Sequence, residues 1–126
     1  MARTAVDITN VTLDAATNSP TGATIVAADG AIIDAGGDFE NLAIRITHTA
    51  AAEYDATIVA PTDSPQAVRS SLGSLVVPFA AGNSTAVTKY IAVEGARFAQ
   101  SDGSIHVDFE SAFTGTIAAL RLPSEN

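Results

Sequence analysis

The chain has 126 residues, the size of one ordinary domain, and it contains no cysteine, so disulfides, thiolate metal sites and cysteine nucleophiles are excluded. Fourteen acidic residues against six basic ones give a net charge of −8, which argues against nucleic acid as a partner. Residues 1–7 lack the apolar run of a signal peptide, and no stretch is long and apolar enough for a membrane span. We therefore expect a soluble acidic domain without an export signal.

The N-terminal part of the chain differs in composition from the rest. Residues 1–22 are rich in Thr, Asn, Asp and Ala, and they end in a turn-forming cluster at 18–22. Apolar residues alternate weakly along this stretch, at Val6, Ile8, Val11 and Leu13. This pattern predicts an extended N-terminal arm over 1–22 that is mobile until it docks on a partner, and a folded domain over 23–126. An ordinary first strand of the domain is the alternative.

The next segments carry strand signals. A short strand over 24–28, the turn at Asp29-Gly30 and a second strand over 31–33 predict a small hairpin. Residues 42–49 alternate apolar and polar side chains with the period of two that marks a strand with one buried face. We expect this strand to pair antiparallel with a return strand over 55–60, which ends before a proline.

One helix is predicted, over 65–72, because Ser64 suits the N-cap, Pro65 the first helical position and Gly73 the position just past the end. Strands follow at 75–79, around 87–93, at 105–110 and at 116–122. Short strands separated by turn signals at roughly 8–12-residue spacing predict an all-β fold. We expect a single antiparallel β-sandwich or small barrel, of jelly-roll or immunoglobulin type.

The two histidines are the first candidates for chemistry. His106 lies on the polar face of its strand beside Asp108 and Glu110, a set that could hold a metal ion, although a solvated strand face is the favoured interpretation. His48 shares a face with apolar residues, which favours a half-buried histidine with a backbone partner over a ligand.

Acidic residues also gather in a glycine-containing loop, at Asp29, Asp34, Asp38 and Glu40, where carboxylates could bind Ca²⁺. Their spacing does not match an EF-hand, and turns favour the same residue types, so we assign no metal site. The chain contains no Gly-x-Ser-x-Gly elbow and no phosphate-binding Gly-x-x-x-x-Gly-Lys motif. We therefore predict no catalytic residues and no cofactor, and we expect a protein that is not an enzyme.

Several short motifs occur in an order that resembles a known family. They are MART at 1–4, Asp29-Gly30 before a short apolar pair, the strands at 42–49 and 57–61, VVPFAAG at 76–82 and DGSIHVDF at 102–109. Together they resemble the small β-rich head decoration (cement) proteins of tailed bacteriophages, which are encoded near the major capsid protein. The resemblance covers most of the chain between residues 24 and 122.

The resemblance implies a structural virion protein that is made in the host cytoplasm. It would bind the outer surface of a capsid and stabilise it by bridging subunits of the major capsid protein. A homo-oligomer, for example a trimer, would be compatible with this role. Alternatives are another virion part, such as a head–tail joining or tail protein, and a carbohydrate-binding or adhesion module. If the N-terminal arm binds the partner, the residues expected in the contact are Arg3, Val6, Ile8, Val11 and Leu13.

Overall fold

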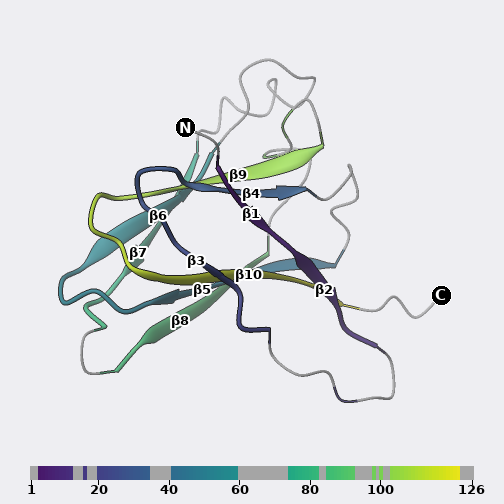
Figure 1. Cartoon of the computed structure of the whole chain (residues 1–126), viewed down its shortest axis with the longest axis horizontal. Helices are drawn as coiled ribbons and strands as arrows, with labels where there is room; N and C mark the ends of the chain where they lie inside the picture. The colour runs from purple at the N-terminus through teal and green to yellow at the C-terminus, as the bar shows by residue number, and fades with distance from the viewer. Residues whose placement is uncertain are drawn as a thin grey trace.

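The computed structural model describes residues 3–12, 16, 20–34, 41–59, 74–82, 85–92, 98, 100 and 103–122, which form two packed β-sheets (Figure 1). Sheet A has the strand order β1-β4-β9-β6-β7, and its strands are β1 (Thr4–Val6), β4 (Ala31–Asp34), β9 (Ser104–Phe109), β6 (Tyr54–Ile58) and β7 (Leu75–Phe79). Sheet B has the order β2-β10-β5-β8, and its strands are β2 (Ile8–Asn10), β10 (Gly115–Arg121), β5 (Leu42–His48) and β8 (Val87–Ala92). The short strand β3 (Ala23–Thr24) also pairs with β10.

The strands β3 to β10 have the connectivity of a jelly roll. They form the orders β3-β10-β5-β8 and β4-β9-β6-β7, and successive strands cross from one sheet to the other except at the β6–β7 hairpin. The pairings within these two sets are antiparallel. The predicted β-sandwich is thus confirmed, and the sheets do not close into a barrel.

Two predicted strand pairings are wrong. The strands β3 and β4 lie in different sheets, so 24–28 and 31–33 form no hairpin. The strands β5 and β6 are separated in the same way, since β5 pairs with β8 and β10 whereas β6 pairs with β7 and β9. The physical reason is that a period of two determines which face of a strand is buried, but it does not determine which strand lies beside it.

The N-terminal residues also depart from the expectation. The strand β1 pairs parallel with β4 in sheet A, and β2 pairs parallel with β10 in sheet B. Figure 1 shows the two strands as one continuous path that passes from the first sheet to the second. The side chain of Val6 is 6% exposed and belongs to the core. In the structure, residues 4–10 are thus docked on their own domain, where burial of Val6 and backbone pairing stabilise them. The expectation that residues 1–22 act as an arm that binds a partner stays a prediction.

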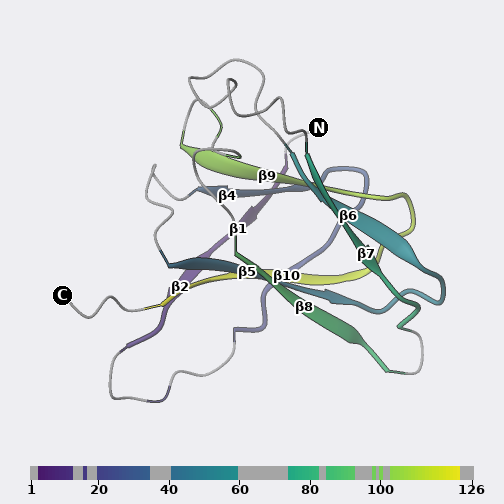
Figure 2. The same ribbon diagram turned by 180° about the vertical axis from the view of Figure 1, so that it is seen from behind.

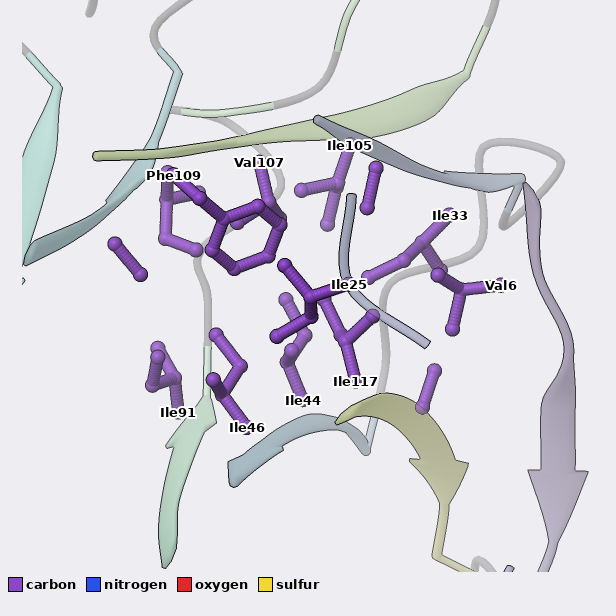
Figure 3. Close-up of a cluster of buried hydrophobic side chains, with 14 of the residues drawn as sticks. Val6, Ile25, Ile33, Ile44, Ile46, Ile91, Ile105, Val107, Phe109 and Ile117 are labelled. Carbon is purple, nitrogen blue, oxygen red and sulfur yellow. The ribbon is translucent and has the colours of Figure 1, made fainter. Parts of the chain in front are cut away.

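The core lies between the two sheets (Figure 3). The predicted inward faces are confirmed: Leu42, Ile44 and Ile46 of β5 are buried, as are Ile105, Val107 and Phe109 of β9. Other core side chains come from the neighbouring strands and the segment after β3, among them Ile25, Ile33, Ile58, Phe79, Ile91 and Ile117. Branched side chains dominate this core because they suit a pleated, half-buried surface.

On the side opposite the N-terminal strands, β7 and β8 are the edge strands of the two sheets, and a side-chain contact links them (Figure 2). Lys89 Nζ of β8 donates to the carbonyl of Pro78 in β7 at 2.7 Å, and it lies 5.3 Å from the centre of the Phe79 ring. Pro78 has no N–H to offer to a further strand. Because the lysine also occupies the proline carbonyl, the edge of β7 is protected there against pairing with another chain.

Two expectations lie outside the described residues. The helix over 65–72 falls there, as do Leu13 and several other residues of the stretch between β2 and β3, so these remain predictions. No helix within the described part of the chain is long and apolar enough to cross a membrane.

Candidate partner-binding surface

The residues expected to contact a partner are placed on the protein's own sheets. Val6 is buried, Ile8 packs against the core, and the backbone N–H of Val11 donates to the carbonyl of Arg121 at 2.8 Å. Arg3 Nη1 forms an ion pair with Asp108 Oδ1 at 2.7 Å and donates to the carbonyl of Val107 at 3.1 Å. The structure brings these four residues together along one side of the sandwich, where their contacts are intramolecular.

His48 is enclosed in the core rather than presented to a ligand. Its ring is fully buried and lies against the rings of Tyr54, Phe79 and Phe113, the last with a centroid distance of 4.4 Å. Nε2 donates to the carbonyl of Ala52 at 2.9 Å. The predicted backbone partner is confirmed, and the side chain is more deeply buried than expected.

The other candidate ligands that the structure describes lie apart from one another, in sheet A or beside it. His106 is half-buried on its outer face, in register with Ile32, and Asp108 two residues further on is engaged by Arg3. Asp29 lies in the turn before β4 and Asp34 is the last residue of β4, so the two residues lie at opposite ends of this strand. Asp38 and Glu40 lie outside the described residues. Within the described ranges, no three His, Asp or Glu side chains are close enough to share a metal ion.

A shallow hollow of about 320 Å³ lies between the N-terminal strands and the segment that leads into β3. Its walls come from both segments and from β10, and they include Val6, Asp7, Thr9, Pro20, Gly22 and Ala118. Because small side chains form most of this lining, the hollow offers few polar groups to orient a ligand. Its main significance is that the N-terminal strands are incompletely packed on this flank.

Charged side chains are segregated between the two sheets. The strands of sheet A contain Asp34, Asp55 and Asp108 and no lysine or arginine. The strands of sheet B contain Arg45, Lys89 and Arg121, and no aspartate or glutamate. In a chain with a net charge of −8, sheet B is thus a region free of carboxylates.

The outer face of sheet B carries a row of threonines. Thr24, Thr116, Thr47 and Thr88 are register partners across β3, β10, β5 and β8. The hydroxyls of Thr47 and Thr88 lie 3.0 Å apart and share a hydrogen bond. Short β-branched side chains lose little conformational freedom when they are covered, so this row can be buried by a partner at a low entropic cost.

The next row on the same face contains Ala118, Arg45 and Tyr90. Arg45 is only 7% exposed because Nη2 donates to the carbonyl of Pro20 at 2.7 Å, which holds that segment over the sheet. Tyr90 is 63% exposed and is one of the large apolar side chains that the structure leaves in solvent. Tyrosine is enriched among the anchor residues of protein contacts, so Tyr90 is the candidate anchor on this face.

This face escaped the sequence analysis, because the residues that form it come from strands far apart in the chain. No protein-family model, curated protein or solved structure matches the chain. The candidate site is therefore defined by its geometry: an outer face of sheet B whose strands carry no carboxylate, with Tyr90 exposed, opposite an acidic outer face of sheet A.

Proposed function

We propose that this chain is a structural virion protein that binds the outside of a tailed-phage capsid and bridges major capsid subunits. The observation that carries the proposal is the charge segregation, because it gives the molecule one face suited to contact and one suited to solvent. Repulsion between carboxylates on the outer face of sheet A would keep neighbouring copies apart and soluble. The motif order described above supplies the capsid as the partner.

The outer face of sheet B is the surface that would meet the capsid. Its threonine side chains are short and at least partly exposed, so many copies can each form a contact of modest affinity. Simultaneous attachment to neighbouring subunits then raises the total affinity through effective concentration. A decoration protein needs such a contact and requires no catalysis.

A pair of matched variants tests the proposal. Thr88→Glu places a carboxylate on the outer face of sheet B, and Val76→Glu places one on the outer face of sheet A; both positions are exposed and lie on edge strands. Under this proposal, the probe is an empty capsid assembled from the major capsid protein of the phage that would encode this chain. In co-sedimentation, we expect saturable binding of the wild type and about tenfold weaker binding of Thr88→Glu, because a buried unpaired charge costs on the order of 1–3 kcal/mol.

Val76→Glu is the control, and it should bind like the wild type. Equal losses in the two variants would contradict attachment through sheet B. Failure of the wild type to sediment, combined with binding to a glycan array, would favour the carbohydrate-binding alternative. Locating the chain in a tail or at a head–tail joint by electron cryomicroscopy of the virion would assign it to another virion part.

A further inference from the structure

The N-terminal strap, residues 3–11, lies outside the jelly roll that β3 to β10 form. It contributes β1 to the edge of sheet A and β2 to the edge of sheet B, and both pairings are parallel. The eight later strands pair with one another without it. The strap therefore lies along the edges of β4 and β10, on one side of a sandwich whose topology is complete without it. We call these two edges the slot.

The contacts that hold the strap are few and peripheral. Each of its strands has three residues, and Val6 is its one buried side chain among the described residues. The ion pair at its start is accessible to solvent, with Arg3 24% and Asp108 55% exposed. The hollow beside Asp7 leaves one flank without packing. Release of the strap would break no pairing inside the jelly roll, which is the property of a segment with low local stability.

A second copy of this chain presents the same slot, with the same edges of β4 and β10 and the same Asp108. The chain between Val11 and Pro20 spans up to about 30 Å when extended, which is long enough to let the strap move away from its own domain. The carbonyl of Pro20 accepts a hydrogen bond from Arg45 of its own domain at 2.7 Å, so this end of the linker stays attached to the domain while the strap moves. An element that fits its own slot fits the identical slot of a partner equally well.

We infer that the strap is exchangeable between copies: residues 3–11 of one chain dock on β4 and β10 of a second chain when the copies are concentrated. The exchange replaces each intramolecular contact by the same contact in the other copy. A high local concentration of copies is therefore sufficient to favour it. It links neighbouring copies into pairs or larger assemblies without any new interface. This inference does not rest on the capsid role, since it concerns the chain by itself.

Because the chain has no native cysteine, disulfides can form only between cysteines that are introduced by substitution. Ala5 and Ile32 are register partners in β1 and β4, so Ala5→Cys and Ile32→Cys are prepared as two separate full-length variants, one labelled with ¹⁵N. The variants are mixed at high protein concentration and oxidised, and the covalent dimers are sorted by mass spectrometry. We expect a dimer linking position 5 of one copy to position 32 of the other, formed in several-fold excess over the control pair.

The control pair is Thr47→Cys with Thr88→Cys, register partners in β5 and β8 that the strap does not include. Its yield measures random collision between exposed thiols. The double variant Ala5→Cys/Ile32→Cys should close within one chain, and oxidation should then abolish the dimers seen by sedimentation velocity. A mixed yield no higher than the control, or dimers that persist in the locked variant, would overturn the inference.

A second pair protects the test against a folding defect. Thr9 and Leu120 are register partners in β2 and β10, and the variants Thr9→Cys and Leu120→Cys should give the same hetero-linked dimer. Circular dichroism and thermal melting of each variant show whether it is folded. Exchange at neither pair in folded variants would also refute the inference.

Discussion

At the scale of single residues, the corner between β9 and β10 contains two residues with positive φ, Ala112 and Gly115, and this conformation is strained for alanine but not for glycine. Gly115 has a φ of +142°, and a Cβ at this position would collide with the carbonyl oxygen of Thr47. Its own carbonyl accepts a hydrogen bond from the N–H of Ile25 at 2.9 Å. Ala112 also has a positive φ, of 75°, although alanine gains nothing from that conformation.

Gly115→Ala should therefore destabilise the protein by on the order of 3 kcal/mol, from the backbone strain and the collision with the neighbouring strand. Thermal unfolding followed by circular dichroism should show a melting temperature lower by about 10 °C. A melting temperature close to that of the wild type would mean that the strand can shift to accept a side chain.

Ala112→Gly is expected to have the opposite sign. Glycine adopts a φ of 75° without strain, so the variant should be more stable by about 0.5–1 kcal/mol despite the greater freedom of its unfolded chain. Denaturant unfolding would measure this as a higher midpoint at an unchanged slope. Destabilisation would show that the alanine methyl group contributes more to packing than its exposed position indicates.

At the scale of elements, the strap shows how far local patterns can be interpreted. Alternation at Val6 and Ile8 is correctly detected in the sequence, but the same alternation suits a strand that docks on another protein and one that docks on its own domain. What decides between them is the slot between β4 and β10, which is assembled from strands far along the chain. The sequence could not reveal that slot because its two edges belong to different sheets.

Val6→Ala tests the docked strap directly. The substitution removes two buried methyl groups and should cost about 2 kcal/mol of stability, which calorimetry would detect as a melting temperature lower by several degrees. Asp7→Ala, at the exposed neighbouring position, should change stability by less than about 0.5 kcal/mol. Equal stability of Val6→Ala and the wild type would favour the free arm after all.

For other strands, the sequence predicted correctly which side chains point into the core. The buried faces of β5 and β9 were predictable because a strict period of two leaves one choice of inward side for each strand. The depth of His48 was not, because Tyr54, Phe79 and Phe113 surround its ring from three separate segments. Local pattern thus specifies which residues point inward, whereas tertiary pairing specifies what they meet.

At the scale of the whole molecule, charge segregation is the property that the linear sequence conceals. The acidic residues Asp34, Asp55 and Asp108 are spread over more than half of the chain, as are the cations of sheet B. The acidic residues and the cations separate into different sheets only in the folded chain, which crosses repeatedly from one sheet to the other. The net charge of −8 was evident from composition, but the carboxylate-free face required the topology.

The parallel pairing of β2 with β10 also determines how the molecule responds to tension. The N-terminus leads into β2 and the C-terminus follows β10, so a pull on the two chain ends drives these neighbouring strands in opposite directions along their length. Their backbone hydrogen bonds are then strained together in shear, whereas an antiparallel hairpin such as β6–β7 would unzip one bond at a time. The strap is therefore hard to drag along its axis, even though each of its strands has only three residues.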